Sequence, residues 1–347
     1  MITQSDFRKL KIVSIVKETA AAKTFVLEPQ DNWKPDYNAG QFITLVFFTE
    51  YGEKRRSFSI TSSPILGEPL SITVKLVENG EFSRNLITKA QEGDFLFSTG
   101  ISGFFQLPKN NKITEQYFFL AAGSGITPCF SLIKTLLHST DKKAVLIYSN
   151  RSEEDTMFLT QLKTLEKNYP GRIVIRFLYS DHSNIHNSRL SSWLLQLLLK
   201  EYIAVTKEKL LFYLCGPFSY MQMAEITLKT YGIIHPQIIK ENFNSLPRLV
   251  VPKPPDTNAH TVIIKINGRE YPLIIKYPQT ILAAAKKEHI PIPYSCEAGR
   301  CGSCAGTCTS GKIWMAYNEV LMDDELAKGK VLTCQAYPVG GDAVVEF

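Results

Sequence analysis

Four cysteines near the end of the chain have a spacing that could hold a metal cluster. The segment PYSCEAGRCGSCAG contains Cys296, Cys301 and Cys304, and Cys334 follows later in VLTCQA. Three thiolates in one short loop and a fourth from elsewhere in the chain form the plant-type arrangement for a 2Fe–2S cluster. A zinc site is the alternative, but zinc sites commonly pair their cysteines in two short knuckles. The spacing therefore predicts a 2Fe–2S cluster with these four cysteines as ligands.

The residues around the cysteines agree with a cluster. Glycines at 299 and 302 allow the backbone to approach inorganic sulfides and to direct N–H groups at them. Along nearly its whole length the segment 260–347 resembles the plant-type ferredoxin domain, including SGKI, LMDDELAKGKVLTCQAYP and the terminal VVEF. That resemblance implies a β-grasp fold. Cys308 lies outside the ligand spacing and is expected to be a small buried hydrophobic residue.

The composition excludes several classes of protein. The 347 residues are 44% hydrophobic and 21% charged, which is typical of folded domains. No run of about 18 uncharged apolar residues is present, and the charged start MITQSDFRKLKIV does not have the apolar core of a signal peptide. We therefore expect a cytoplasmic protein with no membrane partner. The net charge of +6 is not gathered in a basic stripe, so no nucleic-acid partner is expected either.

The hydrophobic pattern divides the chain into three domains and a linker. Short alternating runs such as QFITLVFF and LSITVKLVE predict a small antiparallel β-barrel in residues 1–109. Strands such as KAVLIYS alternate with helical segments in residues 110–246, which predicts a parallel α/β sheet covered on both faces. Four prolines in residues 247–259 cannot lie inside a helix or sheet, so this segment is predicted to be a linker before the cluster domain, 260–347.

A second motif lies in the predicted barrel. Arg56, Ser57, Phe58 and Ser59 occur in RRSFSITSSP, followed by SITVKLVENGEFSRNL and then by a Gly-rich strand–helix turn. This order resembles the ferredoxin–NADP reductase superfamily, whose members have Arg-x-Tyr-Ser, then a Val-Lys strand, then Gly-x-x-Ser. The resemblance covers about residues 1–246 and implies a flavin-binding barrel followed by a nicotinamide nucleotide domain. Phe58 stands where the family usually has tyrosine, so that hydroxyl contact is lost.

The resemblance implies a role for each residue of the motif. Arg56 would bind the flavin pyrophosphate through its guanidinium. Phe58 would pack on the isoalloxazine or ribityl face, and Ser59 would lie near flavin N5, where the hydride arrives. Because GEFS matches the pyrophosphate-binding pattern of FAD-containing members, FAD is expected rather than FMN, which a related branch uses. The other flavin-binding residues implied are Ser57, Thr73, Val74, Lys75, Gly80, Phe82 and Ser83.

A glycine-containing turn predicts the nucleotide site. In FFLAAGSGITPCFSLI, Gly123 and Gly125 lie between a strand and a helix, and Thr127 and Pro128 fall in the first helical turn. A helix N-terminus can bind phosphate, and proline suits its first turn. The third glycine of the Rossmann fingerprint is missing, so the pattern alone is weak. It matches the Gly-x-Gly-x-x-Pro loop of the superfamily.

Three further segments match the superfamily. Asn150 and Arg151 follow the second predicted strand, where the adenosine ribose would lie. Arg151 could meet a 2′-phosphate, so NADPH is expected, but an ordinary surface arginine is the alternative and NADH stays open. Cys215, Gly216 and Pro217 follow a later strand and in relatives face the nicotinamide; for Cys215, structural packing is the alternative. Glu241, in KENF, aligns with a Glu-x-Phe strand near the flavin. The catalytic group implied is Ser59, Cys215 and Glu241.

Together the motifs suit the transfer of electrons from a nicotinamide to an iron–sulfur cluster. A nicotinamide releases two electrons as a hydride, an iron–sulfur cluster accepts one at a time, and a flavin can do both. We therefore expect an NAD(P)H-dependent oxidoreductase that passes electrons through FAD and the 2Fe–2S cluster to a partner protein. The domain order resembles reductase components of multicomponent oxygenases, including the phenylacetyl-CoA epoxidase reductase type, so an oxygenase component is the expected acceptor. The alternatives are a stand-alone ferredoxin- or flavodoxin-type reductase serving a desaturase or cytochrome, and a redox-sensing module without turnover.

Overall fold

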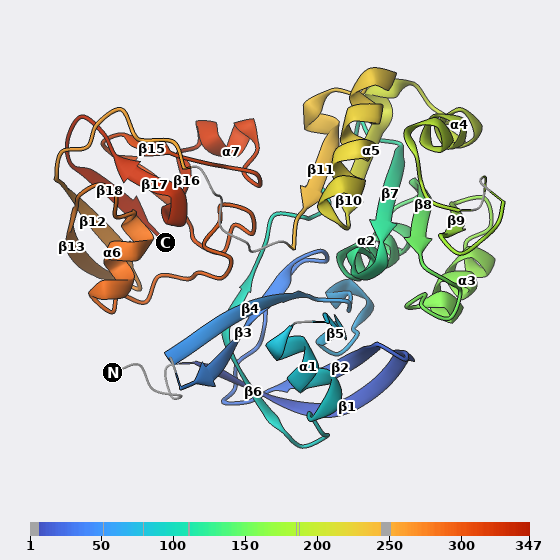
Figure 1. Cartoon of the computed structure of the whole chain (residues 1–347), viewed down its shortest axis with the longest axis horizontal. Helices are drawn as coiled ribbons and strands as arrows, with labels where there is room; N and C mark the ends of the chain where they lie inside the picture. Colours follow the sequence, from blue (N-terminus) through green and yellow to red (C-terminus); the bar gives the residue numbers. More distant parts are fainter. Residues whose placement is uncertain are drawn as a thin grey trace.

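Three main sheets organise the chain (Figure 1). The computed structural model describes residues 7–50, 52–78, 80–109, 112–184, 186, 188–243 and 251–347. The predicted domain boundaries at residues 110 and 246, and the start of the predicted linker at 247–250, lie outside these described residues.

The first sheet is an antiparallel barrel with strand order β4-β3-β6-β1-β2-β5. An isolated bridge between Ile60 and Ile72 joins the end of β4 to β5 and closes the sheet. Its interior is filled by alternate apolar side chains such as Ile43 and Leu45. The predicted antiparallel barrel is confirmed. The elements are β1 (Arg8–Thr19), β2 (Ala22–Pro29), β3 (Phe42–Thr49), β4 (Gly52–Ser59), β5 (Ser71–Lys75), α1 (Glu81–Thr88) and β6 (Phe95–Ser102).

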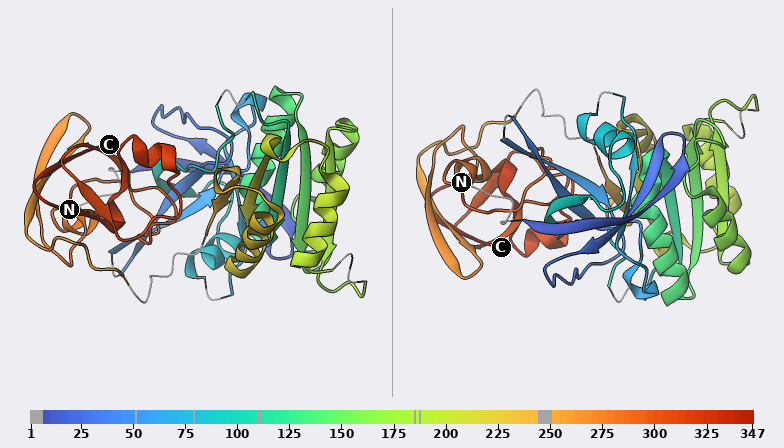
Figure 2. Two further views of the ribbon diagram at one scale, coloured as in Figure 1. Left: turned by 90° about the horizontal axis from the view of Figure 1, so that it is seen from above. Right: turned by 90° about the horizontal axis from the view of Figure 1, so that it is seen from below.

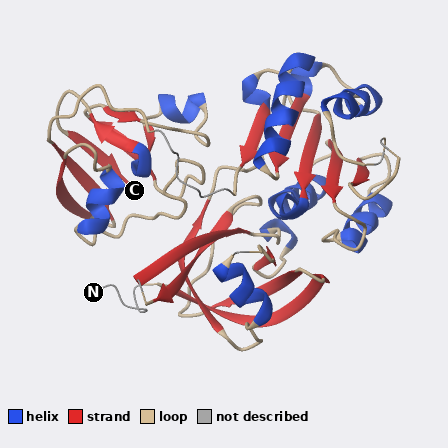
Figure 3. Cartoon of the chain, viewed as in Figure 1, coloured by secondary structure: helices blue, strands red, loops and turns tan. Residues whose placement is uncertain are grey.

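The second sheet is parallel throughout, with order β11-β10-β7-β8-β9. Alternate residues of β7 face opposite ways: Phe119 packs with α2 and α3, and Phe118 packs with α4 and α5. The predicted α/β sheet with helices on both faces is therefore confirmed (Figure 3). The elements are β7 (Gln116–Ala122), α2 (Ile126–Ser139), β8 (Lys143–Asn150), α3 (Leu159–Asn168), β9 (Ile173–Tyr179), α4 (Ser192–Tyr202), β10 (Leu210–Cys215), α5 (Phe218–Tyr231) and β11 (Ile238–Glu241).

The third sheet has order β13-β12-β18-β14-β16, and a two-stranded sheet, β15-β17, lies beside it. Helix α6 buries Ile281 and Leu282 against Val262 and Ile264 of β12. This mixed sheet with one packed helix is the predicted β-grasp arrangement. The elements are β12 (His260–Ile266), β13 (Arg269–Ile275), α6 (Ile281–Lys287), β14 (Ala305–Ser310), β15 (Ile313–Met315), α7 (Asp323–Ala327), β16 (Lys330–Leu332), β17 (Ala336–Pro338) and β18 (Ala343–Glu346).

The C-terminal sheet and the parallel sheet lie at opposite ends of the molecule, with barrel strands between them (Figure 2). The loop that carries the first three predicted cluster ligands, residues 294–304, faces the barrel and the end of β11. Among the described helices, none combines the length and the apolar character needed to span a membrane.

Candidate redox site between the three sheets

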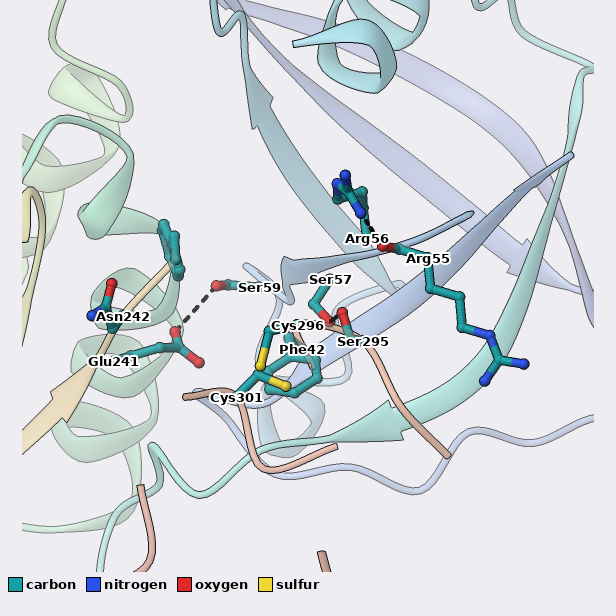
Figure 4. Close-up of a pocket in the computed structure, with 11 residues that line it drawn as sticks. Phe42, Arg55, Arg56, Ser57, Ser59, Glu241, Asn242, Ser295, Cys296 and Cys301 are labelled. Atoms are coloured by element: carbon teal, nitrogen blue, oxygen red, sulfur yellow. Dashed lines mark hydrogen bonds between the residues drawn. The ribbon is translucent and has the colours of Figure 1, made fainter. Parts of the chain in front are cut away.

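One pocket is built by residues from the barrel, the parallel sheet and the loop 294–304 of the C-terminal domain (Figure 4). Strand β4 of the barrel forms one wall, the end of β11 forms a second, and the loop 294–304 forms a third. Residues predicted to bind the flavin therefore share a pocket with two predicted cluster ligands. The lining residues are Phe42, Arg55, Arg56, Ser57, Ser59, Glu241, Asn242, Phe243, Ser295, Cys296 and Cys301.

The four predicted cluster ligands lie as two pairs. Cys301 is hydrogen-bonded to Cys296, and Cys304 to Cys334. Since each iron of a 2Fe–2S cluster bound by four cysteines takes two protein thiolates, two pairs of thiols fit such a cluster. Across the described part of the chain, no group of three or more His, Cys, Asp or Glu side chains is arranged around a single point where one ion could bind.

The backbone of the cluster loop favours thiolates. The main-chain N–H of Ala298 points to Cys296 Sγ at 3.4 Å, and that of Ser303 points to Cys301 Sγ at 3.5 Å. The hydrogen bond from the Cys301 thiol, helped by backbone N–H donors that include Ala298, lowers the pKa of Cys296 to about 6, whereas the pKa of Cys301, the donor, is raised. Thiolates are the form that binds iron, so the donor set fits the cluster.

Two glycines let the loop follow this path. Gly299 and Gly302 have φ of +71° and +75°, a left-handed conformation that glycine adopts without strain. At Gly302 there is a second constraint, because a Cβ would lie 2.6 Å from the ring of Phe104. Gly302 thus bends the loop and also allows it to touch the connection that follows the barrel.

Two serines of β4 tie the barrel to the other walls of the pocket. Ser57 Oγ donates to Ser295 Oγ at 2.7 Å, next to the predicted ligand Cys296. Ser59 Oγ donates to Glu241 Oε2 at 3.3 Å. Because side chains two residues apart on a strand share one face, a single face of β4 makes both contacts.

Glu241 is the most perturbed carboxyl group of the pocket. It is 8% exposed, and burial raises its pKa to about 8, with the hydrogen bond from Ser59 acting in the opposite direction. Cys215 pairs with Glu241 in the register of β10 and β11, and burial followed by the charge of Glu241 raises the pKa of its thiol. The three residues predicted to be catalytic are therefore adjacent.

Arg56 lies beside α1, where the other predicted pyrophosphate-binding residues are found. Its guanidinium carbon is 5.1 Å from the centroid of the Phe82 ring, and the side chain is exposed. Gly80 precedes α1, and Ser83 Oγ in its first turn accepts from the Val77 N–H. An exposed guanidinium next to a helix N-terminus suits a phosphate group, so these residues fit a flavin dinucleotide.

The structure does not bring every predicted flavin residue to the pocket through its side chain. Phe58 is half-buried and packs against the barrel core. Thr73 is buried and shares a hydrogen bond with Thr24, and Val74 belongs to the barrel core. Lys75, the next residue of β5, reaches the nucleotide turn, where its Nζ is 3.7 Å from the position of a Cβ at Gly123.

The predicted nucleotide residues meet at the carboxyl ends of β7, β8 and β10. From β7 the chain adds β8 and β9 on one side and then β10 and β11 on the other, and parallel sheets bind ligands at such a reversal of strand order. A Cβ at Gly125 would lie 2.0 Å from the carbonyl oxygen of Cys215, so only glycine allows this approach. Thr127 donates to Ser124 O inside the turn, and Pro128 lies in the first turn of α2.

A cleft of about 410 Å³ at this edge holds the remaining predicted residues and several that the sequence did not indicate. Arg189 comes from the loop before α4, which carries no recognisable motif, and it lines the same cleft as Arg151. The predicted residues in the cleft are Lys75, Gly123, Asn150, Arg151 and Pro217. Gly216 lies beside them, where a Cβ would come within 3.0 Å of the Ala122 side chain. The additional ones are Ala122, Ser149, Ser180, Ser188, Arg189, Leu190, Ser219, Tyr220 and Met223.

The fold and the site define a three-part electron-transfer reductase. Residues 264–339 match the 2Fe-2S iron-sulfur cluster binding domain, and residues 119–226 match the oxidoreductase NAD-binding domain. The phthalate dioxygenase reductase structure has the same fold over the whole of both chains, with a TM-score of 0.60 and 24% identity.

Two curated relatives match this chain along almost its full length and almost all of their own. The ferredoxin reductase component of 3-ketosteroid-9-alpha-monooxygenase from Rhodococcus rhodochrous is 31% identical, covering 97% of this chain and 96% of its own. A component of the 1,2-phenylacetyl-CoA epoxidase from Escherichia coli (strain K12) is 32% identical, covering 98% of each chain. The chain belongs to the family of these ferredoxin reductase components. It is an oxidoreductase that transfers electrons from NAD(P)H through FAD and a 2Fe–2S cluster.

Proposed function

We propose that this reductase takes electrons from NADPH and delivers them to an oxygenase component. The acceptor follows from the two relatives, one a ferredoxin reductase component of a monooxygenase and the other a component of an epoxidase. Of these two, the phenylacetyl-CoA epoxidase type is the one that the sequence motifs also resemble. We place the protein in the cytoplasm, because the four ligand cysteines must stay reduced until iron binds.

The preference for NADPH is supported by the charge of the nucleotide cleft. Arg151 and Arg189 both line it, one after β8 and one before α4. Two guanidinium groups in one cleft suit a 2′-phosphate, which accepts paired hydrogen bonds from arginine. Lys75, at the flavin end of the same cleft, adds a third positive charge.

Each part of the chain receives one cofactor in this proposal. Residues 1–109 hold FAD, residues 110–246 hold the nucleotide, 247–259 link them to the last domain, and 260–347 hold the cluster through the four cysteines. Bound FAD accepts a hydride and releases electrons singly, which is the chemistry that joins a nicotinamide to a cluster.

The residues of the pocket control charge and protons where the hydride arrives. The Glu241 carboxyl carries a proton at neutral pH because burial raises its pKa to about 8. Ser59 Oγ donates to Glu241 Oε2, which leaves the other oxygen, Oε1, to carry that proton. Burial also raises the pKa of the Cys215 thiol, so this neighbour of Glu241 in the sheet stays neutral and adds no charge.

The observation that carries the proposal is the shared pocket. Ser59 and Arg56 of the barrel, Glu241 of the nucleotide sheet, and Cys296 and Cys301 of the cluster loop line one cavity. A hydride can therefore arrive and single electrons can leave at neighbouring places, and the domains need no large movement between the two steps.

An anaerobic titration of the holoenzyme tests the proposal. NADPH should bleach the flavin absorbance and then produce the paramagnetic signal of a reduced 2Fe–2S cluster. Oxygenase captured with the tagged reductase should then oxidise its substrate at the expense of NADPH. A flavin that NADPH leaves oxidised would favour the sensing module instead, and turnover with a desaturase or cytochrome alone would favour the stand-alone reductase.

A further inference from the structure

Tyr294 lies two residues before Cys296 and is held by charged groups of the barrel. The guanidinium carbon of Arg55 is 3.7 Å from the centroid of the Tyr294 ring. Tyr294 donates its hydroxyl hydrogen to Glu53 Oε1 at 2.9 Å. The same oxygen accepts from Arg55 at 2.7 and 3.1 Å, so the three side chains form one connected group. We refer to Glu53, Arg55 and Tyr294 as the latch.

The charged pair of the latch is buried, and part of its cover comes from the C-terminal domain. The side chains of Arg55 and Glu53 are only 7% and 16% exposed, although both belong to a barrel strand. Buried charges are costly unless they are paired and hydrogen-bonded. Here the partner that covers the pair comes from the loop 294–304, and the tyrosine supplies both a ring face for the cation and a donor for the carboxylate.

The latch lies on the face of β4 that also forms the pocket. Glu53, Arg55, Ser57 and Ser59 follow at every second residue, so they share one face of the strand. Along this face the latch comes first, then the hydrogen bond from Ser57 to Ser295, then the contact of Ser59 with Glu241. The loop runs beside this face: Tyr294 belongs to the latch, Ser295 accepts the hydrogen bond from Ser57, and Cys296 is the predicted ligand. Two attachment points on one rigid strand fix both the position and the direction of the ligand segment.

The opposite side of the loop is held as well. Asn242 Nδ2, next to Glu241, donates to Glu319 Oε1 at 2.9 Å. Glu319 also accepts from Tyr317 at 2.6 Å and pairs with Arg300 of the cluster loop at 3.3 Å. Domains joined by a linker move relative to one another unless an interface restrains them. These polar contacts restrain the cluster loop from both sides.

We propose that Tyr294 is a positioning residue which, through Arg55 and Glu53, sets the distance between the flavin site and the 2Fe–2S cluster and so the rate of electron transfer between them. The step concerned moves one electron from the reduced flavin to the oxidised cluster, and no atom is transferred. The proposal rests on the proposed function for this electron path, and it adds the residue that determines its speed.

The test compares Tyr294→Leu, Tyr294→Phe and Tyr271→Leu in the complete holoenzyme. Tyr271 is a half-buried tyrosine of β13 outside the latch and serves as the matched control. Anaerobic stopped-flow with NADPH gives the rate of flavin reduction and the rate of cluster reduction separately. Small-angle scattering gives the maximum dimension of each variant, and a redox titration gives the cluster potential.

We expect Tyr294→Leu to slow cluster reduction by about tenfold or more, because a displacement of about 1 Å can have effects of that size on a positioned reaction. Flavin reduction and the cluster potential should match the native protein, and the maximum dimension should increase. Tyr294→Phe keeps the ring over Arg55 but loses the bond to Glu53, so it should be intermediate. Arg55→Leu should slow cluster reduction as much as Tyr294→Leu does, and the double variant should reduce the cluster no more slowly than either single variant.

A native rate of cluster reduction in Tyr294→Leu, with unchanged scattering, would overturn the proposal. Loss of the cluster spectrum in both Tyr294 variants would also overturn it, since Tyr294 would then support cluster assembly rather than placement. If NADPH fails to reduce the flavin of the native protein, the proposed function falls, and scattering by the variants still decides whether the latch holds the domain.

Discussion

Ser59 Oγ and Glu241 Oε2 lie 3.3 Å apart, and this contact joins the last residue of a barrel strand to the last residue of the parallel sheet. The carboxyl group is buried, and the serine hydroxyl is its hydrogen-bond donor among the described residues. The contact therefore places a carboxyl with a pKa of about 8 at the boundary between the barrel and the parallel sheet.

Glu241 should make hydride transfer pH-dependent. Because its pKa is raised to about 8, the carboxyl is neutral below that pH and negative above it. A negative charge beside the acceptor disfavours the arrival of a hydride, so the rate of flavin reduction should fall as pH rises through about 8. Glu241→Gln stays neutral and should flatten the profile. The measurement is anaerobic stopped-flow with NADPH between pH 6 and 9.5.

A control on another carboxylate separates this effect from general changes in charge. Glu225 of α5 pairs with Lys229 and Lys240, away from the pocket. Glu225→Gln should keep the native pH profile. A decline near pH 8 that persists in Glu241→Gln would assign the titration to another group.

Loss of one proposed ligand cysteine should stop electron transfer through the cluster and leave electron transfer to the flavin intact. Cys301→Ser should abolish reduction of cytochrome c, which needs the cluster, and leave reduction of ferricyanide by NADPH largely intact. Cys308→Ser is the matched control, because Cys308 is half-buried in β14 and donates to Ser310 O. Both activities should survive in that variant. Equal loss of the two activities in Cys301→Ser would contradict the order of nucleotide, flavin and cluster.

The three folds could be predicted because their signals are local, and the proposed cluster ligands rest on a signal of the same kind. Ligand spacing, strand alternation and the glycine turn each occupy a short stretch of sequence, and the structure has the expected sheets in the expected order. Cys308 was expected to be buried but is only partly so, since its strand β14 exposes that end.

The contacts between domains could not be predicted in this way. Ser57 and Ser295 are 238 positions apart and Glu53 and Tyr294 are 241 apart, and no sequence motif indicates that either pair meets. Their meeting depends on how three separately folded sheets pack together. Arg189 was missed for a related reason, because the cleft that it shares with Arg151 exists only once β8 and the loop before α4 lie side by side.

Arg151 and Arg189, which line the predicted nucleotide cleft, should determine whether NADPH or NADH is preferred as the electron donor. Arg151→Ala and Arg189→Ala should each raise the KM for NADPH by about tenfold, the value expected when a charge-assisted hydrogen bond of about 1.5 kcal/mol is lost. The KM for NADH should change little, because that nucleotide has no 2′-phosphate. Steady-state kinetics with ferricyanide measure both. Lys167→Ala, on the exposed side of α3, is the control. An unchanged ratio of the two KM values would remove the basis for proposing NADPH.

Gly302 should tolerate alanine less well than a glycine with the same backbone strain elsewhere. Gly302 and Gly340 have φ of +75° and +72°, so alanine costs about 1 kcal/mol at either position for the left-handed conformation. At Gly340 nothing lies within 4 Å of a new Cβ, whereas at Gly302 the Cβ would lie 2.6 Å from the Phe104 ring. Gly302→Ala should therefore push the cluster loop away from the barrel and lower the iron and sulfide content per chain, while Gly340→Ala keeps the native content.

A second substitution tests whether the contact with the Phe104 ring is the cause. Adding Phe104→Ala removes the obstructing ring and should restore part of the cluster in Gly302→Ala. Equal iron content in the two glycine variants would show that only the backbone conformation matters at Gly302.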